Sequence, residues 1–357
     1  MARERFLMAG GGTGGHVMPL LAVAEQLKAR GHEPYFVGTR TGFEARLVPQ
    51  KGFELEYVDI GGFQGVGTLR KLKLAYQLPL SVAQCVGSIR KHRPRACFSL
   101  GGYAAAPPVA AGVLMGLPLV VMEPNAMPGM VNRIWGRFAS KALLSFEEAA
   151  IYFPKQAVEF TGLPVREAFF AIQAKPRSEW LDVLITGGSQ GSQTLNRAMR
   201  ESWPLLRESG IKIRLLHQCG KREVETLQAE FSKAGIEGSV QAFVEDMPAA
   251  FAGADLVISR AGAGTVSELV AAGRPAVLVP FPYATDDHQT KNAQALVKAG
   301  AALMVKDNEM NGAKVLEIVR RFCEDRIGLE SMAERSKALG KPGAAARAAD
   351  ILENISG

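Results

Sequence analysis

The side chains best suited to chemistry in this sequence stand beside glycine-rich turns. His16 follows a turn at residues 10–15 that holds five glycines, and Glu268 follows a small-residue turn at residues 261–264. An apolar run precedes each turn, and a helical pattern follows it. The first N–H groups of a helix lack intrahelical partners and carry partial positive charge, so both turns are candidate phosphate sites. An imidazole there can titrate near neutral pH.

The segment 255–280 shows this arrangement most clearly. It predicts a strand over residues 256–258, a helix from about Thr265 to Ala272, and a second strand over residues 276–279. The spacing Thr265-x-x-Glu268 also fits a capping box, in which both side chains serve only the helix terminus. Capping and ligand binding therefore compete for Glu268.

The strand–turn–helix arrangement occurs four times, with turns at residues 10–15, 101–103, 187–191 and 261–264. The segments LPLVVMEPN and RPAVLVPFP correspond, one in each half of the chain. The pattern predicts an α/β protein with two Rossmann-like parallel-sheet domains, over residues 1–163 and 164–343. Residues 161–164 are the expected linker. The last segment, 344–357, contains a helix that could pack back on the first domain.

Gly10, Gly12 and Gly15 match the dinucleotide pattern G-x-G-x-x-G, which is weak evidence alone. The second predicted strand ends at Gly38-Thr39-Arg40, with no carboxylate for a ribose. A nicotinamide-dependent oxidoreductase is therefore disfavoured, and these three glycines are its only support.

Positive charge is concentrated in the first half. Residues 1–160 hold 18 Lys and Arg against 11 Asp and Glu, whereas residues 161–357 hold 24 of each. This asymmetry favours an anionic partner for the first domain: a lipid head group, a nucleic acid or a phosphorylated substrate. The four cysteines are far apart, which indicates reduced thiols in a cytoplasmic protein.

Two segments bear on membrane contact. Residues 96–122 carry no charge, but their glycines and prolines predict strand, turn, buried helix and strand rather than a membrane span. After the loop at 61–67, an apolar stripe of Leu69, Leu72, Tyr76 and Leu80 is flanked by basic residues. The stripe fits either a core-facing helix or a basic surface resting on an anionic leaflet.

Several motifs together resemble the MurG family of N-acetylglucosaminyltransferases, which convert lipid I to lipid II in bacterial peptidoglycan synthesis. They are GGTGGHVMP (11–19), LGGYAAAPP (100–108), EPN (123–125), TGLPVR (161–166), GGSQG (187–191), SRAGAGTVSEL (259–269), AAGRPAVLVPFP (271–282) and DDHQTKNA (286–293). They are in the family's order and cover nearly the whole chain. The departure is at Met122 and Pro124, where many relatives have His and Gln.

The resemblance implies two Rossmann-like domains of the GT-B type facing across a cleft. The C-terminal domain would bind UDP-N-acetylglucosamine, and the N-terminal domain the lipid-linked acceptor. The implied donor-binding residues are Thr13, Gly14, Gly15, Asn125, Arg166, Ser189, Val244, Ala263, Gly264, Thr265, Val266, Ser267, Glu268 and Gln289. The implied acceptor-binding residues are Gly101, Gly102, Tyr103 and Asn132. Within this scheme Thr265 is expected to cap the helix while Glu268 binds the ribose hydroxyls.

The candidate general bases are His16, which ends the first glycine turn, and Glu123, whose pKa burial could raise. There is no Asp-x-Asp pair, and Asp286 and Asp287 would point to opposite faces of an extended segment. We therefore expect no metal and no cofactor, with helix N-termini and Arg166 stabilising the leaving diphosphate. The resemblance implies inversion at the anomeric carbon.

The expected partners are UDP-N-acetylglucosamine, lipid I, anionic phospholipid, and cell-wall and division proteins, with no nucleic acid. The expected location is the cytoplasmic face of the bacterial inner membrane, peripherally bound. Three alternatives remain: a sugar-nucleotide epimerase on the same architecture, the oxidoreductase, and a non-enzymatic lipid- or nucleic-acid-binding protein. The last leaves the four glycine turns unexplained.

Overall fold

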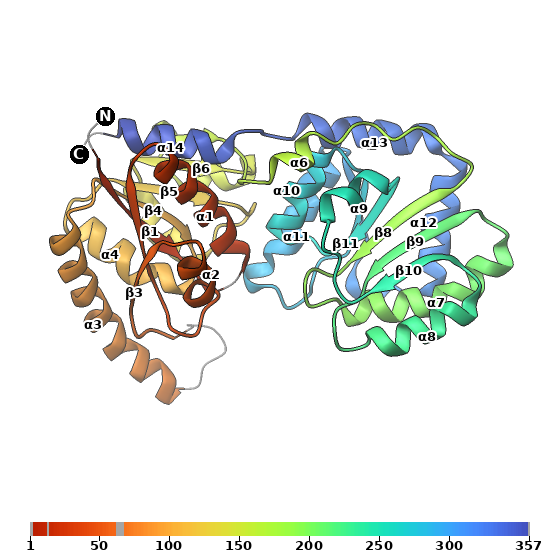
Figure 1. The fold of residues 1–357 in the computed structure, drawn as a ribbon, viewed down its shortest axis with the longest axis horizontal. Helices are drawn as coiled ribbons and strands as arrows, with labels where there is room; N and C mark the ends of the chain where they lie inside the picture. The colour runs from red at the N-terminus through yellow and green to blue at the C-terminus, as the bar shows by residue number, and fades with distance from the viewer. Residues whose placement is uncertain (1–2, 13, 62–67, 356–357) are drawn as a thin grey trace. The chain divides into compact units, whose positions relative to one another are not determined.

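The computed structural model describes residues 3–12, 14–61 and 68–355, and gives only the backbone of residues 14 and 68–75 (Figure 1). The chain divides into two compact units. The first contains Met1–Pro164 together with Gly343–Gly357, and the second contains Val165–Pro342.

The first unit is built on a parallel sheet of seven strands in the order β3-β2-β1-β4-β5-β6-β7. Its strands are β1 (Arg5–Gly10), β2 (Glu33–Gly38), β3 (Glu54–Tyr57), β4 (Ala96–Gly101), β5 (Leu119–Glu123), β6 (Lys141–Leu144) and β7 (Val158–Phe160). Its α-helices are α1 (Gly14–Ala29), α2 (Glu44–Gln50), α3 (Thr68–His92), α4 (Ala106–Leu114), α5 (Met130–Trp135) and α14 (Ala344–Asn354). Short 3-10 helices are η1 (Tyr103–Ala105), η2 (Gly136–Phe138), η3 (Glu147–Tyr152) and η4 (Lys155–Ala157).

Both faces of this sheet are covered, because successive residues of its central strand β1 are apolar and point to opposite faces of the sheet. Phe6 and Met8 of β1 belong to a core cluster with α1 and α14, while Leu7 and Ala9 belong to a cluster with α3 and α4. A parallel sheet buried on both faces reads as a continuous apolar run, as residues 6–9 do. In Figure 1, α14 lies beside α1, from which it is separated by more than 300 residues of sequence.

The second unit has a parallel sheet of six strands in the order β10-β9-β8-β11-β12-β13. Its strands are β8 (Leu181–Thr186), β9 (Ile213–Gln218), β10 (Glu237–Gln241), β11 (Leu256–Ser259), β12 (Ala276–Leu278) and β13 (Ala302–Met304). Its helices are α6 (Glu167–Phe170), α7 (Gln193–Ser209), α8 (Val224–Ala234), α9 (Met247–Gly253), α10 (Ala263–Ala272), α11 (His288–Lys298), α12 (Gly312–Glu324) and α13 (Arg326–Ala338), with 3-10 helices η5 (Thr285–Asp287) and η6 (Asp307–Glu309).

The strand order of each sheet reverses at one place, between β1 and β4 in the first unit and between β8 and β11 in the second. The carboxyl ends of these four strands lead into the four glycine turns found in the sequence. Open α/β sheets bind ligands at the carboxyl ends of the strands where the order reverses. The topology therefore brings the glycine turns together in pairs, one pair in each unit.

The predicted strand–turn–helix units are confirmed, including residues 96–122, which form β4, η1, α4 and β5. The helix predicted from about Thr265 begins at Ala263. The helix after the first glycine turn, α1, begins at Gly14, so His16 lies in its first turn. Glycine adopts helical backbone angles as well as turn angles, and Pro19, which lies inside α1, removes one backbone hydrogen bond because it has no N–H.

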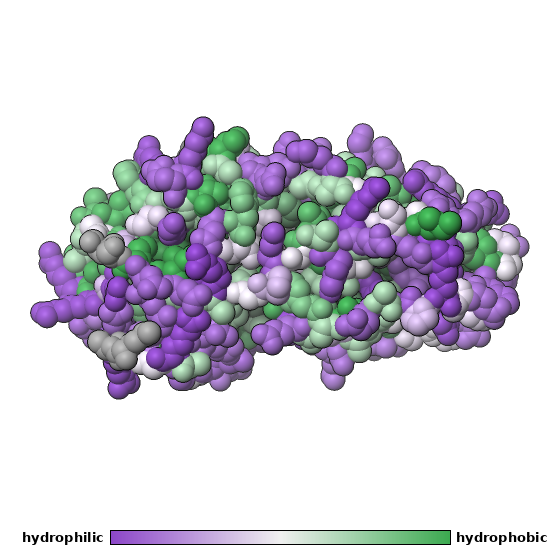
Figure 2. Space-filling view, turned by 90° about the horizontal axis from the view of Figure 1, so that it is seen from above, coloured by the Kyte–Doolittle hydropathy of each residue, from purple (hydrophilic) through white to green (hydrophobic). Residues whose placement is uncertain are grey.

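None of the helices in the described part of the chain is long and apolar enough to cross a bilayer. On the face drawn in Figure 2, hydrophilic side chains are interspersed with smaller apolar patches.

Candidate active site

A buried carboxylate closes the first glycine turn. Glu44, the first residue of α2, is 1% exposed. Its Oε2 accepts a hydrogen bond from the Gly12 N–H at 2.8 Å, and its Oε1 accepts from the N–H and hydroxyl of Thr39 at 2.9 and 2.8 Å. A carboxylate that accepts several such bonds holds its donors firmly, because charge-assisted hydrogen bonds are the stronger ones.

Three glycines make room for this carboxylate. A Cβ at Gly11 or Gly38 would come within 2.5 Å of the Glu44 side chain, and one at Gly42 within 2.1 Å. Glu44 lies a few residues beyond β2, and its oxygens are taken up by Gly12 and Thr39 rather than left for a ribose. This carboxylate occupies the position that a phosphate would take at the Gly12 N–H, so the glycine pattern is not evidence of a dinucleotide site.

The turn after β4 packs directly on the first glycine turn. Gly102 has φ +82°, and a Cβ there would lie 2.7 Å from the Gly11 carbonyl oxygen and 3.8 Å from Cγ of His16. Gly12, with φ +87°, faces the Tyr103 ring, which a Cβ would approach to 2.7 Å. Only glycine fits these positions, because both the backbone angles and the space exclude a side chain. The structure thus brings together His16, Gly102 and Tyr103.

The remaining predicted residues of this turn are placed less fully. Gly14 and Gly15 form the start of α1, and Thr13 lies outside the described residues.

Glu123, at the end of β5, is the second buried carboxylate of the first unit. Its Oε1 accepts from the N–H and side-chain amide of Asn125 at 3.0 and 3.1 Å. Its Oε2 accepts from the Gly129 N–H at 3.3 Å and from the Asn132 amide at 2.8 Å. Burial raises the pKa of Glu123 to about 7, and the bonds from Asn132 and Asn125 act in the opposite direction. With 1% of its surface exposed, Glu123 holds the 123–132 loop together.

Asn132 is 2% exposed and supports the turn after β4. A Cβ on Gly101, whose φ is +80°, would lie 3.1 Å from the Asn132 amide. The Oδ1 atom of Asn132 is buried and has no hydrogen-bond partner within the described ranges. Asn132 therefore lies beneath the turn, whereas Asn125 is partly exposed.

In the second unit, the N-terminus of α10 is open. Its N-cap is Gly262, in extended conformation and without a side-chain cap, so the prediction that Thr265 caps this helix was wrong. The Val266 N–H donates to the Gly262 carbonyl oxygen at 2.9 Å, and the N–H groups of Ala263, Gly264 and Thr265 have no partner among the residues described. Glycine is a favourable N-cap because it reaches this conformation without strain. Three donors thus converge at the terminus.

Glu268 lies one turn into α10 and is partly exposed. Desolvation raises the pKa of Glu268 to about 7, and the nearby Arg166 acts to lower it. Its carboxylate makes no hydrogen bond to any part of the chain that the structure describes. Arg166 itself is exposed, precedes α6, and stacks on the Phe169 ring at 5.1 Å. The side chains of Val266 and Ser267, by contrast, are buried.

Gln289 of α11 reaches back to the same turn. Its Oε1 accepts from the N–H groups of Ala261 and Phe281 at 3.2 and 3.0 Å, which leaves its NH₂ group available to donate. An extended segment was considered for the preceding Asp286 and Asp287, but they do not lie in one. Both have φ +53° and belong to a tight turn that begins α11.

The glycine turn after β8 is held by a residue that the sequence did not single out. Gln218, at the carboxyl end of β9, is 1% exposed. Its Nε2 donates to Thr186 Oγ1 at 3.1 Å and to the Gly188 carbonyl oxygen at 2.9 Å, while its Oε1 accepts from the Val244 N–H at 2.8 Å. The available signal was a polar residue ending an apolar strand at this sheet edge. Because the Val244 N–H is occupied, its carbonyl oxygen is the group left for a ligand.

Ser189 is exposed at the tip of this turn. The following helix, α7, differs from α10, because its N-cap Ser192 accepts a side-chain bond from the Leu195 N–H at 3.3 Å.

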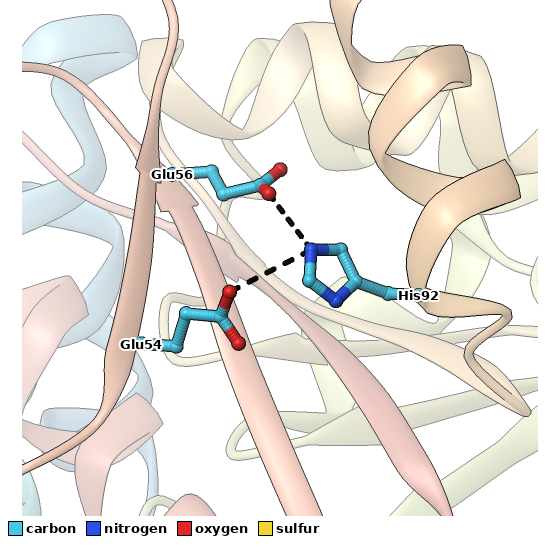
Figure 3. A group of neighbouring side chains, drawn as sticks. All are labelled: Glu54, Glu56 and His92. Atoms are coloured by element: carbon cyan, nitrogen blue, oxygen red, sulfur yellow. Dashed lines mark hydrogen bonds and ion pairs between the residues drawn. The ribbon is translucent and has the colours of Figure 1, made fainter.

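One group outside these turns has the residue types of a metal site: Glu54, Glu56 and His92 (Figure 3). Each carboxylate is already paired, Glu54 with Arg5 at 2.6 Å and Glu56 with Lys91 at 2.8 Å and with His92 at 2.7 Å. Although burial acts to raise the pKa of Glu56, the bonds from Lys91 and His92 outweigh it and hold that pKa at about 2. The group is an ion-pair cluster that fastens β3 and α3 to β1.

Comparison with known proteins agrees with this geometry. Residues 6–144 match the glycosyltransferase family 28 N-terminal domain, and residues 182–353 match its C-terminal domain. The protein is therefore a glycosyltransferase with the two Rossmann-like units of the GT-B architecture. A crystal structure of MurG from Acinetobacter baumannii is similar over 99% of this chain and 100% of its own, with TM-score 0.85 and 32% identity.

A relative from Solibacter usitatus (strain Ellin6076) is 54% identical over 98% of this chain and 96% of its own length. A relative from Myxococcus xanthus (strain DK1622) is 39% identical over 98% of this chain and 93% of its own. Both are named UDP-N-acetylglucosamine--N-acetylmuramyl-(pentapeptide) pyrophosphoryl-undecaprenol N-acetylglucosamine transferase. The chain belongs to the MurG family of glycosyltransferases.

The fold is shared more widely than the sequence. A crystal structure of the UDP-GlcNAc 2-epimerase from Neisseria meningitidis has TM-score 0.65 at 12% identity, over 98% of this chain and 99% of its own. Similarity at this level shows the fold alone.

Proposed function

We propose that this enzyme transfers N-acetylglucosamine from UDP-N-acetylglucosamine to the 4-hydroxyl of the muramyl sugar of lipid I, giving lipid II. In this proposal, residues 164–343 bind the donor, and residues 1–163 with the C-terminal helix bind the acceptor. The observation that carries the proposal is the open N-terminus of α10, where three N–H groups and the carboxylate of Glu268, one turn further on, make no hydrogen bond within the described residues. The names of the relatives supply the identity of the two substrates.

The open helix terminus suits the diphosphate of the donor. The N–H groups of Ala263, Gly264 and Thr265 would stabilise the negative charge that grows on the leaving diphosphate. The exposed guanidinium of Arg166 would add a bidentate contact, and the exposed Ser189 hydroxyl a further one.

Neighbouring groups suit the remaining parts of the donor. The Glu268 carboxylate, which makes no hydrogen bond within the described chain, would accept from two ribose hydroxyls. The Val244 carbonyl oxygen would accept from the uracil N–H, since its own N–H is held by Gln218. The NH₂ group of Gln289, which donates to no described residue, would bind the sugar. Asn125 of the first unit remains a predicted sugar contact.

For the proton of the acceptor hydroxyl, we assign His16 as the first candidate base and Glu123 as the second. His16 lies in the first turn of α1 against the turn at Gly102, at the carboxyl ends of β1 and β4. Glu123 is able to exchange a proton near pH 7, but both of its oxygens already accept hydrogen bonds. We therefore give Glu123 a positioning role and His16 the contact with the acceptor. Gly101, Gly102 and Tyr103 would line the acceptor side, and Asn132 would support them from below.

The reaction would proceed with inversion and without a metal. A single displacement needs one base on the acceptor face and charge stabilisation on the leaving-group face, which the two sets of residues would supply. No residue is assigned to hold a metal or a cofactor.

The enzyme would work peripherally at the cytoplasmic face of the inner membrane, against anionic phospholipid. Two observations support this: the positive charge surplus of residues 1–160, and apolar side chains left exposed on the first unit. Tyr76 and Leu80 of α3 are 71% and 48% exposed, and Ile151 is 82% exposed. The side chains of Leu69 and Leu72, which the same stripe includes, lie outside the described residues. Cell-wall and division proteins remain proposed partners.

The test is an assay of UDP release from UDP-N-acetylglucosamine with a lipid I analogue as acceptor, with and without EDTA. We expect acceptor-dependent UDP release that EDTA leaves unchanged. Loss of turnover in EDTA with recovery on adding magnesium would refute the metal-free mechanism. A donor-only incubation is the control for the epimerase alternative, since an epimerised sugar in that mixture would refute transfer as the activity.

A further inference from the structure

A cavity of about 480 Å³ lies within the second unit at the end of α10 opposite to its open N-terminus. Its walls are the segment 170–177, the residues that follow α10, and α13. Its volume is in the range of small-molecule sites, which span roughly 300–1,000 Å³. None of the predicted donor or acceptor residues lines it.

Five cationic side chains line the cavity, and three of them are neutralised. Lys175 pairs with Asp255 at 2.9 Å, and Arg326 lies 3.8 Å from the same carboxylate. Arg177 and Glu330 form an exposed pair at the rim. These three cations therefore add little net charge to the cavity.

The other two, Arg274 and Lys337, pair with no carboxylate in the described chain. Arg274 donates to the carbonyl oxygens of Phe251, Ala252 and Gln173 at 2.8, 2.9 and 3.2 Å. Lys337 donates to the carbonyl oxygens of Phe170, Ile172 and Ala271, at 2.9, 3.5 and 2.8 Å.

Burial lowers the pKa of Arg274. Burial and the nearby positive charge of Arg274 both lower the pKa of Lys337. Two like charges therefore lie close together in a poorly solvated place. Asp255 is near enough to raise the pKa of Arg274 but does not outweigh burial, and it already pairs with Lys175. Glu334 lines the same cavity and pairs with neither cation in the described chain. Such an arrangement is costly unless an anion offsets it.

Part of the Arg274 guanidinium faces the cavity. Arg274 is 5% exposed, and its recorded hydrogen bonds use Nε and Nη2. Its Nη1 makes no bond to the described chain and is not among the fully buried atoms that lack a partner. Because Arg274 lines the cavity, the two N–H groups of Nη1 are the part of its guanidinium left to donate to a ligand there.

We propose that this cavity binds a small organic oxyanion, with its phosphate or carboxylate against Arg274 and Lys337. Its apolar part would lie on the remaining walls, which include Phe170, Ile172, Pro275, Leu329 and Ala333. Arginine donates two parallel N–H groups to either kind of oxyanion, so the geometry suits both. If Arg274 and Lys337 served only to cap carbonyl oxygens near the end of α10, neither the cavity nor its apolar wall would be required.

The site is connected to the donor site through α10. The ammonium group of Lys337 donates both to the Ala271 carbonyl oxygen of α10 and to the Phe170 carbonyl oxygen in the segment that follows Arg166. The Lys337 side chain also packs closely on Gly273, where a Cβ would lie 2.8 Å from it. An anion that draws Lys337 toward the cavity would change how α10 and the segment that follows Arg166 are held together. This coupling rests on the proposed donor role of α10, whereas the binding itself does not.

The experiment is isothermal titration of the full-length protein with phenyl phosphate at constant ionic strength, with UDP present to fill the donor site. We expect one site in the wild type. Arg274→Leu should weaken binding about 10- to 100-fold, the loss expected for a charge-assisted hydrogen bond. The matched control is Lys314→Gln, which removes a partly exposed cation on α12 that pairs with Glu317 outside the cavity. No binding by the wild type, or equal binding by Arg274→Leu and the control, would overturn the proposal.

A second variant covers the case in which Arg274→Leu does not fold. Ala333→Phe fills the cavity and leaves both cations in place, and we expect it to abolish binding. Unchanged binding by Ala333→Phe would place the ligand elsewhere and overturn the proposal. Benzoate and inorganic phosphate are the comparison probes: benzoate should bind, and inorganic phosphate should bind at least tenfold more weakly than phenyl phosphate. Because no transfer reaction is measured, a failure of the proposed function shows separately, as absence of UDP binding.

Discussion

The turn before α1 and the turn before α10 are built from the same strand–glycine turn–helix unit, but their backbone N–H groups differ in whether the chain supplies an acceptor. In the first unit the Gly12 N–H is occupied by the buried carboxylate of Glu44. In the second unit the N–H groups of Ala263, Gly264 and Thr265 face no partner in the described residues. One turn is closed by the chain itself, and the other is open to a ligand.

The difference shows that a glycine turn defines a potential anion site, while the side chains from neighbouring segments decide whether it is available. Each unit also contains a carboxyl group with its pKa raised to about 7, Glu123 in the first and Glu268 in the second. Glu123 accepts hydrogen bonds on both oxygens, whereas Glu268 accepts none within the described chain. The carboxylates of Glu44 and Glu123 order loops of the first unit, whereas that of Glu268 is bonded to no described loop of the second.

The largest expected effect comes from removing the carboxylate of the open turn. Glu268→Ala should reduce UDP affinity about 100- to 1,000-fold, because two charge-assisted bonds to the ribose would be lost. Titration calorimetry with UDP measures this, with the exposed Glu309→Ala as control. Unchanged UDP affinity would show that the two turns do not differ in ligand binding.

Removing the charge of Glu44, which closes the first turn, should lower the free energy of unfolding. In Glu44→Gln, an amide NH₂ would face an N–H donor at Gly12 or Thr39, so we expect a loss of about 1–3 kcal/mol in the free energy of unfolding. Denaturant unfolding measures it, and Glu25→Gln, which removes an exposed partner of Lys51, is the control. An equal, small effect of both substitutions would mean that Glu44 does not hold the turn closed.

The enclosed carboxyl group of the first unit should make stability depend on pH. Glu123 has a pKa of about 7 in the folded state, against 4.5 for an ordinary Glu. Between these values the folded state holds the extra proton, so this group's contribution to stability falls as the pH rises. Relative to the wild type, Glu123→Gln should gain about 2 kcal/mol between pH 5 and pH 8. Parallel stability curves for the two proteins would contradict the enclosed state of Glu123.

The smallest effects concern the caps of α7 and α10. Ser192→Ala removes the side-chain cap of α7 and should cost about 1 kcal/mol of unfolding free energy, whereas Thr265→Ala removes no cap and should cost less than about 0.5 kcal/mol. Thermal or denaturant unfolding of the two single variants gives the comparison. A larger cost for Thr265→Ala would restore its capping role.

The sequence was sufficient to predict the strand–turn–helix units, because periodicity and glycine turns are local signals. It located the turn at 261–264, Glu268 one helical turn beyond it, and Gln289, whose Oε1 accepts from the Ala261 N–H of that turn. It was wrong about the cap of α10, since a glycine N-cap and a Thr-x-x-Glu spacing are both compatible with this sequence.

The sequence could not predict what closes the first turn. Glu44 and Gly12 are separated by 32 positions and meet only after β2 and α2 have packed beside β1. The same applies to Gln218, whose partner Val244 lies 26 positions away. Contacts of this kind depend on the tertiary arrangement of strand ends, which no local pattern contains.

The packing of α14 on α1 has a consequence for biosynthesis. Ala348, Ala349, Ile351 and Leu352 complete the core around α1, and Arg30 pairs with Asp350 and Glu353. Proteins generally begin to fold from the N-terminus as they leave the ribosome. Here, however, the N-terminal unit must wait with an uncovered apolar surface until the last helix emerges, whereas residues 165–342 are continuous and can finish first. The order in which the two units are translated is therefore the reverse of the order in which they can be completed.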